Sequence, residues 1–275
     1  MKTSRRQLGL IVEGNSTKSV VLRYPGLADG IGPIKALSPA VARRVSNFFR
    51  SGESVDNYEG LRECESVLIR VPDSSIPRII SEICGSRLDL TGMSFVLCES
   101  WLSSDSLANL KSRGATVATV VPVLGDNGKW FALEGQFVAV KRARRLLNGL
   151  NARTVELKPG TKHLYFAASA FAETLPRALF TAAQKALRMS GVTGKHMYEL
   201  VEEMAQGMFR DLDRGTRGGW SGASVGCPEQ IASGYIDELK KTSPELAVLL
   251  CEQLRLSEPF VPPRGKHGSD DSGPL

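Results

Sequence analysis

The chain of 275 residues is long enough for one large domain or two ordinary ones. Its composition, 42% hydrophobic and 23% charged with a mean hydropathy of −0.11, is globular, and no stretch approaches the roughly 20 apolar residues of a membrane span. The formal net charge of +6 comes from small, scattered basic groups, which favours a solvated surface over a nucleic-acid-binding face.

The five cysteines are odd in number, and no two are spaced as Cys-x-x-Cys. This pattern predicts neither a zinc site nor a disulfide framework, so we expect no metal, and free thiols in a reducing compartment. The apolar run that follows Arg5 and Arg6 ends at Glu13, which is too short for an export signal. The sequence therefore predicts a cytoplasmic protein.

The first half of the chain alternates short apolar runs with amphipathic segments. The runs predict strands at residues 8–12, 33–37, 66–71, 94–98, 116–121 and 136–140, and the segments between them predict helices at 39–51, 75–84 and 104–113. Strands that are continuously apolar are typical of a parallel sheet buried on both faces. We therefore expect an α/β fold with a Rossmann-like, mostly parallel sheet.

One crossover differs from the others. The first crossover should be a helix after residue 17, but Tyr24-Pro25-Gly26 interrupts it. Proline removes a backbone donor and glycine favours a turn, so we expect a short or kinked helix between the first two strands.

The second half is mainly helical. A helix at 143–150 and a short strand at 153–157 precede helices at 162–189, 196–212, 229–241 and 244–256. Pro176 is expected to kink the first of these long helices, and Ser243-Pro244 to begin the last. The predicted domains are a Rossmann-like domain at 1–158 and an all-α C-terminal domain at 159–257, followed by a disordered Pro/Gly/Ser-rich tail at 258–275.

The turn after the first strand stands where a dinucleotide-binding protein has its phosphate loop. In the pattern G-x-G-x-x-G the glycines permit a tight turn, close approach of the pyrophosphate and close helix packing. Here these positions hold Val12, Gly14 and Thr17, and Glu13 adds a negative charge. Backbone and hydroxyl groups of the turn would still suit a phosphate at a helix N-terminus. The candidate contacts to NADP or NAD are Gly14, Asn15, Ser16 and Thr17.

A second candidate contact to the cofactor lies after the third predicted strand, at Val71 and Pro72. Ligands of open α/β sheets bind beyond the carboxyl ends of the strands, so this turn should border the crevice. Asp73, which follows, is also explained as a helix cap. After the second predicted strand there is neither an acid for a ribose hydroxyl nor an arginine for a 2′-phosphate, so NAD and NADP remain alternatives.

Few side chains suit acid–base catalysis. The chain has three histidines and no Ser-His-Asp, HExxH or metal-spaced cluster. Lys162 and His163 stand at the predicted domain boundary, and Glu173 follows in an Ala/Phe/Leu-rich part of the same predicted helix. These three are the candidate catalytic residues, and a capping or surface role is the alternative for each.

Seven stretches occur in the order and spacing of a known family: LGLIVEGN, SVLIRVPDSSIPRI, TGMSFVLCESWLSSDSL, GATVATVVPV, EGQFVAV, TKHLYFAASAFAETLPRAL and WSGASVGCPEQIASGYIDEL. From about residue 8 to 256 the chain resembles the Rossmann-like proteins with a C-terminal helical domain of unknown function. These are relatives of pyrroline-5-carboxylate reductase, ketopantoate reductase and 6-phosphogluconate dehydrogenase. The resemblance implies an NAD(P)-linked oxidoreductase with an unassigned small-molecule substrate, and a homodimer formed through the helical domain.

The chain departs from this family around the crevice. The family's Val-Pro-Asp turn is kept at 71–73. Where the family has a His-Thr-Ser-Gly run, this chain has Leu97-Cys98-Glu99-Ser100, and where it has a His-Pro pair, this chain has Val121-Pro122. The Asn of the family's long helix is replaced by Thr174. The family's Thr-Gly-Pro run with a following Arg is replaced by Ser221-Gly222-Ala223 with Gly226. Two interpretations follow: an NAD(P)-linked oxidoreductase with a degenerate fingerprint, or a non-catalytic binding or regulatory protein that keeps the scaffold and has lost the cofactor.

Overall fold

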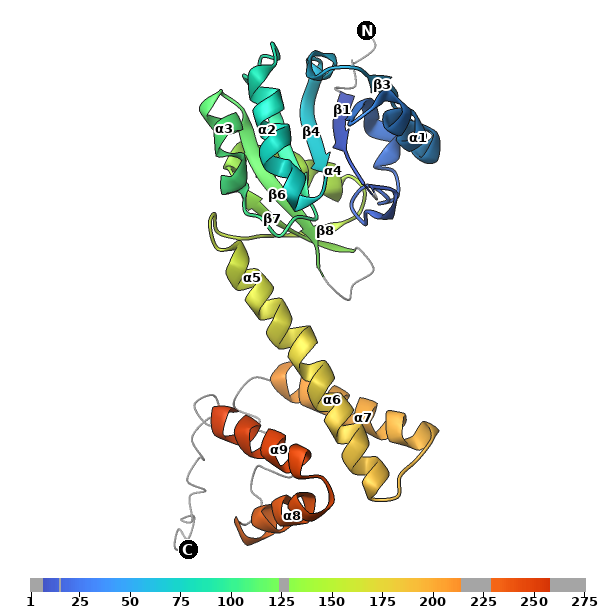
Figure 1. Ribbon diagram of the computed structural model, residues 1–275, viewed down its shortest axis with the longest axis vertical. Coiled ribbons are helices and arrows are strands. Elements are labelled where there is room, and N and C mark those ends of the chain that lie inside the picture. The colour runs from blue at the N-terminus through green and yellow to red at the C-terminus, as the bar shows by residue number, and fades with distance from the viewer. Residues whose placement is uncertain (1–6, 15, 124–128, 214–228, 258–275) are drawn as a thin grey trace, which may run out of the picture. The chain divides into compact units, whose positions relative to one another are not determined.

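The computed structural model describes residues 7–14, 16–123, 129–213 and 229–257 (Figure 1). It forms two compact units, Met1–Glu173 and Thr174–Leu275. The predicted domain boundary, after residue 158, lies earlier in the chain, and the helix that begins at Lys162 belongs to the first unit. The predicted disordered tail, at 258–275, lies outside the described residues.

The first unit is built on one sheet. Within the described residues the strands are β1 (Gln7–Val12), β2 (Ile31–Ala36), β3 (Glu53–Val55), β4 (Cys64–Arg70), β5 (Ser94–Cys98), β6 (Thr116–Pro122), β7 (Trp130–Gly135) and β8 (Arg153–Glu156). Their order is β3-β2-β1-β4-β5-β6-β7-β8, and the described pairs are parallel except for β6 with β7. The predicted α/β fold with a mostly parallel sheet is confirmed.

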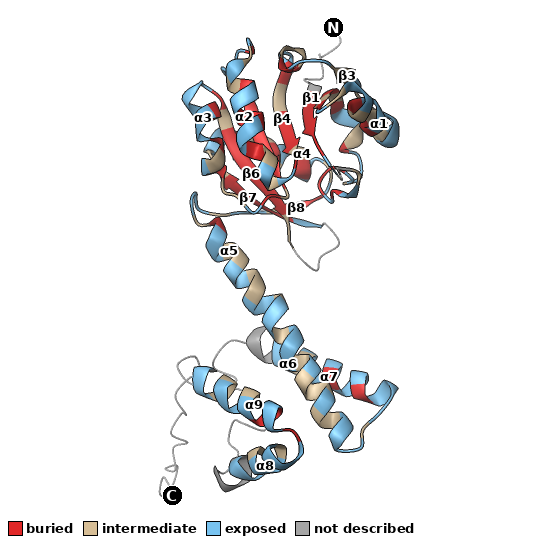
Figure 2. Ribbon diagram, viewed as in Figure 1, coloured by how far each residue is buried: buried red, intermediate tan, exposed pale blue. Residues whose placement is uncertain are grey.

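Helices cover both faces of the sheet, as its apolar strands require. The helices of this unit are α1 (Pro39–Phe49), α2 (Ile76–Gly85), α3 (Ala108–Ser112), α4 (Phe137–Asn148) and α5 (Lys162–Ser169). Leu10 and Val12 of β1 pack in the core on the side of α1 and α4, whereas Ile11 packs in the core on the side of α2 and α3. Figure 2 shows the central strands as the buried part of the unit. Because both faces are apolar, polar groups collect where the strands end.

The first crossover contains no α-helix between residues 16 and 30. The chain forms a 3-10 turn at Ser16–Lys18, then irregular turns, and a second 3-10 turn at Ala28–Gly30. The predicted interruption at Tyr24-Pro25-Gly26 is confirmed, and it goes further than a kink. The usual helix N-terminus, with its aligned backbone dipoles, is therefore missing at this end of β1.

One predicted strand is wrong. Residues 136–140 were expected to be a strand, but β7 lies just before them and α4 begins at Phe137. After Gln136 the run is apolar at each of its four positions, so it shows no period of its own. The helical period becomes visible only over the whole of α4. Ala139, Ala143 and Leu147, spaced four residues apart, are buried, whereas Phe137 is 70% exposed.

The second unit is helical, as predicted. Its described helices are α6 (Leu175–Met189), α7 (Lys195–Asp213), α8 (Glu229–Thr242) and α9 (Pro244–Ser257). Between α5 and α6 the chain makes a π-helical turn, Ala170–Thr174, just before Pro176. A proline lacks the N–H of a regular helical hydrogen bond, so the break falls beside the predicted kink.

Two further absences agree with the sequence. In the part of the chain that the structure describes, no helix is long and apolar enough to cross a membrane. The described cysteines are free thiols: Cys64, Cys84, Cys98 and Cys251. Burial raises the pKa of Cys98 far above its ordinary value, so this thiol is an inert part of the core.

Gly135, the last residue of β7, provides a test of this packing. Its φ is 141°, and a Cβ there would lie 2.4 Å from the carbonyl oxygen of Val117 and 2.6 Å from the Cα of Ala118. We expect Gly135→Ala to lower the free energy of unfolding by about 1–3 kcal/mol from backbone strain alone, with a further loss from the clash.

The control is Gly85→Ala at the end of α2, where φ is not positive and an added Cβ meets nothing within 4 Å. Urea denaturation of both variants measures the difference. Equal stabilities would contradict this description of the β6–β7 contact.

Candidate functional site

The candidate site lies at the carboxyl edge of the sheet, where β1, β4 and β5 end side by side. From β1 the chain passes to β2 on one side, while β4 lies on the other. This is the topological switch point, where open α/β sheets bind their ligands. The residues that directly follow these three strands are Glu13, Val71 and Glu99, so two acidic residues stand at this edge.

Gly14, in the turn after β1, adopts a left-handed backbone conformation. Its φ is 64°, in the left-handed region, and a Cβ added there would lie 3.6 Å from Pro72, an ordinary contact. Gly14 and the Val71-Pro72 turn therefore lie next to each other at this edge. Ser16 and Thr17 follow in the 3-10 turn, and Asn15 lies outside the described residues.

Glu13 occupies the edge next to this turn. Its side chain is about one-tenth exposed, and it forms an ion pair with Arg78 of α2. Arg78 also pairs with Glu82 at 2.7 Å. The N–H of Glu13 donates to the carbonyl of Arg70 at 3.2 Å, which extends the contact between β1 and β4. A carboxylate is thus fixed beside the glycine turn.

Glu99 reaches across the edge from the end of β5. One carboxylate oxygen accepts hydrogen bonds from the Ser19 hydroxyl at 2.6 Å and from the Val21 N–H at 2.7 Å, while the other faces the Nε of Arg70 at 3.2 Å. Its side chain is 13% exposed, and its backbone has a φ of 54°. The side chain therefore links β5, the end of β4 and the first crossover.

These residues do not fit a dinucleotide phosphate held in the ordinary way. A pyrophosphate needs free backbone donors at a helix N-terminus and tolerates no fixed negative charge nearby. Here the crossover has no such helix, the Val21 N–H is taken by a carboxylate, and Glu13 lies beside the turn. Sequence reasoning identified Gly14 and Glu13 but missed Ser19, which nothing in the sequence links to Glu99.

Asp73 borders the same edge but does not cap a helix. No side-chain bond caps the turn that Asp73 begins or the helix α2 that follows. Its Oδ2 instead accepts the Trp101 N–H at 3.0 Å. The cap prediction is wrong, because the carboxylate of Asp73 bonds the loop after β5 and not the N-terminus of α2.

Lys162, the first residue of α5, is fully buried. Its ammonium donates to the carbonyl oxygens of Ser100 at 2.9 Å and Leu102 at 2.6 Å, and it lies 5.7 Å from the ring centre of Phe166. Burial lowers its pKa to about 8, and the negative charges of Glu134 and Asp73 oppose this shift. Lys162 thus fixes the loop that follows Glu99 to the start of α5.

Glu134 of β7 is a buried group that the sequence did not reveal. Its carboxylate accepts the N–H and hydroxyl of Ser104, both at 2.8 Å, and the Gly160 N–H at 3.1 Å. The signal in the sequence that could have identified Glu134 is an acidic residue within an otherwise apolar strand. Together with Lys162 it joins the loop after β5 to the segment that enters α5.

The structure does not gather the three candidate catalytic residues into one site. His163 is exposed, and Glu173 is half-buried in the π-helical turn. At about 1.5 Å per residue, Glu173 lies roughly 16 Å along the helix from Lys162. In the described residues no group of three metal-ligating side chains is present.

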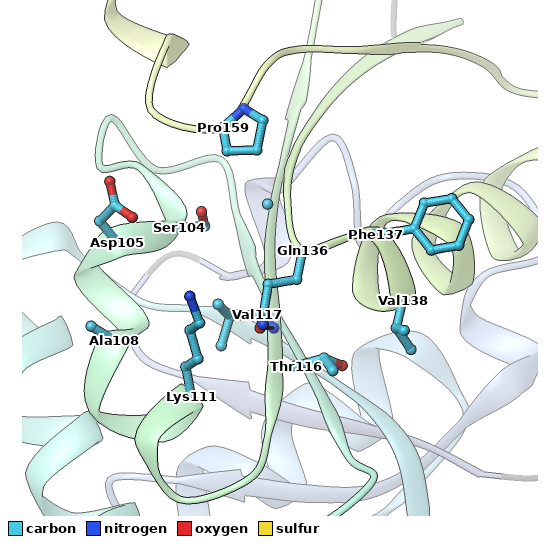
Figure 3. A pocket seen from close by; sticks show the side chains of 11 residues that line it. Ser104, Asp105, Ala108, Lys111, Thr116, Val117, Gln136, Phe137, Val138 and Pro159 are labelled. Atoms are coloured by element: carbon cyan, nitrogen blue, oxygen red, sulfur yellow. Dashed lines mark hydrogen bonds between the residues drawn. The ribbon is translucent and has the colours of Figure 1, made fainter.

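A separate cavity of about 510 Å³ lies near the start of β6, between α3 and the first turn of α4 (Figure 3). Lys111, Gln136 and Phe137 are among its lining side chains. None of the candidate cofactor or catalytic residues lines it, so it is distinct from the edge formed by β1, β4 and β5.

Comparison with known proteins agrees with the fold. Residues 129–218 match a family model described as a domain of unknown function, DUF2520. No curated protein matches the sequence.

Three solved structures are similar over most of the chain. A putative NADP oxidoreductase from Bacteroides fragilis has 13% identity and a TM-score of 0.70, covering 91% of this chain and 96% of its own. An imine reductase from Myxococcus stipitatus in complex with NADP+ has 15% identity and a TM-score of 0.63, covering 92% and 94%. A pyrroline-5-carboxylate reductase from Coxiella burnetii has 15% identity and a TM-score of 0.58, covering 93% of both chains. The chain therefore shares the Rossmann-like fold of these three proteins, as its resemblance predicts.

The buried Lys162 gives the unit a defined pH response. Between pH 8 and 10.5 the folded protein has released a proton that the unfolded chain keeps, because the folded pKa lies below the ordinary value of 10.5. The free energy of unfolding therefore rises with pH across this window, by about 3 kcal/mol for this one group.

The measurement is urea denaturation at several pH values, with Lys162→Met as the reference that lacks the group. We expect the stability of the natural protein, relative to the variant, to increase from pH 8 to 10.5. A flat or falling difference would contradict the burial of the ammonium.

Proposed function

We propose that this protein is a cytoplasmic, homodimeric binding or regulatory protein that keeps the reductase scaffold but does not use NAD(P) as a hydride carrier. The observation that carries the proposal is the pair of fixed carboxylates, Glu13 and Glu99, at the edge where a dinucleotide would place its phosphates. Each carboxylate takes up the charge of an arginine that a phosphate would otherwise attract, and Glu99 also uses the hydroxyl and N–H donors that a phosphate needs.

The second candidate is an NAD(P)-linked oxidoreductase that acts on an unknown small molecule. It is favoured by the fold shared with the imine reductase that was solved with NADP+, and by the left-handed turn at Gly14. In this function Lys162, His163 or Glu173 would supply the proton. The ammonium of Lys162 would first have to leave the carbonyls of Ser100 and Leu102.

A homodimer is supported by the composition of the helical unit. Its buried apolar side chains, among the described residues, are Met197, Val201, Leu246 and Ala247. On α7 the side chains of Leu200, Met204 and Met208 repeat every fourth position and are exposed, Met204 by 61%. An exposed apolar row on a helix is the usual mark of a protein interface, and we propose a second copy of this chain as its partner.

Cofactor titration distinguishes the two functions. A ligand present at 100 times its Kd stabilises a protein by about 2.7 kcal/mol, which raises Tm by several degrees. We expect no saturable change in Tm with NADPH or NADH up to millimolar concentration. A saturable rise at micromolar NADPH would overturn the first proposal and support the oxidoreductase.

The homodimer has a separate test by light scattering coupled to size-exclusion chromatography. We expect a mass of twice 29.8 kDa for the natural chain and a shift toward the monomer for Met204→Glu, because a charge in the apolar row must be desolvated.

Gln206→Glu adds the same charge at an exposed polar position of α7 and is the matched control. A natural chain that is monomeric at micromolar concentration, or two variants that behave alike, would contradict the proposed interface.

A further inference from the structure

We infer that the Ser19 hydroxyl, the Val21 N–H and the Arg70 guanidinium form an oxyanion-binding site, which Glu99 fills in place of a phosphate or carboxylate group of a ligand. The inference deepens the proposed function, because it names the chemical class that a binding protein with this crevice would recognise. A ligand enters by displacing the Glu99 side chain.

Two of the donors, the Ser19 hydroxyl and the Val21 N–H, are buried and converge on one point. Ser19 is fully buried and Val21 nearly so, yet both point their donors at the same carboxylate oxygen, at 2.6 and 2.7 Å. The Ser19 oxygen in turn accepts the Leu22 N–H at 3.0 Å, which fixes the direction of its own hydrogen. Short, convergent bonds to a charged acceptor are the stronger class of protein hydrogen bond.

The third donor supplies the charge. Arg70 is the last residue of β4, and its Nε lies 3.2 Å from the second oxygen of Glu99. An exogenous carboxylate presents the same two oxygens, a phosphate monoester presents three terminal oxygens, and inorganic phosphate presents four. The site therefore selects for an oxyanion and not for a neutral ligand.

Glu99 is also positioned so that it can leave. It follows β5 at the mouth of the crevice, and its side chain retains 13% exposure, whereas Ser19 behind it has none. Its backbone has a φ of 54°, a conformation that glutamate rarely adopts. Glycine adopts it without strain, so Glu99→Gly empties the site without forcing the chain into a new turn.

The test compares the response of Tm to sodium phosphate, sodium acetate and sodium chloride at equal ionic strength. For Glu99→Gly we expect phosphate or acetate at millimolar concentration to raise Tm saturably, by roughly 3 °C or more beyond chloride. The natural protein, whose site is filled, is expected to respond to the three salts alike.

Arg50→Gly is the matched control, because Arg50 also has a φ of 54° but lies at the end of α1, outside the site. It separates the relief of backbone strain from the opening of the site. Where the glycine variant folds poorly, Glu99→Ala opens the same site and is measured in the same way.

A further titration of Glu99→Gly with NADPH distinguishes a dinucleotide phosphate from a smaller oxyanion as the ligand of this site. A rise in Tm at micromolar NADPH assigns the site to a dinucleotide phosphate, and a response to phosphate or acetate alone assigns it to a smaller ligand. A Glu99→Gly protein that responds to all of these as it does to chloride would overturn the inference. NADPH binding by the natural protein would instead overturn the proposed function and leave the phosphate result standing.

Discussion

Burial of the central strands on both faces is the constraint from which the rest of this structure follows. Strands such as β1, β4 and β5 have helices on one side and on the other, so their interior positions are apolar. Most polar and charged side chains of these strands therefore lie at the strand ends. The same constraint that folds the domain therefore concentrates Glu13, Arg70 and Glu99 at one edge, where open α/β sheets bind ligands.

At this edge a contact within the protein competes with any ligand. Without Glu99 the buried Ser19 hydroxyl and Val21 N–H would lose the acceptor of these bonds, which is costly, so its carboxylate stabilises the first crossover. That crossover has no helix of its own to order residues 16 to 30. Opening the site to a ligand and holding the crossover in place thus depend on the same three bonds.

The sequence predicts what depends on local patterns. The strand at residues 94–98 is found at those positions, and the interruption after residue 17 follows from Pro25 and Gly26. The run at 136–140 was mistaken because the four consecutive apolar residues after Gln136 fit a strand and a buried helix equally. The link between Ser19 and Glu99 joins residues 80 positions apart, and only the folded sheet brings them together.

The two functions differ in what they require of polar groups at this edge. An enzyme holds donors and acceptors ready for atoms of the substrate or the transition state. Here Lys162 donates to two loop carbonyls, and Glu134 accepts hydrogen bonds from Ser104 and Gly160. Glu99 accepts hydrogen bonds from the first crossover. Each of these charged groups already has partners inside the protein. Of the three, Glu99 alone has a side chain that is still in part exposed, so at the inferred oxyanion site a ligand would compete with an internal contact of the protein.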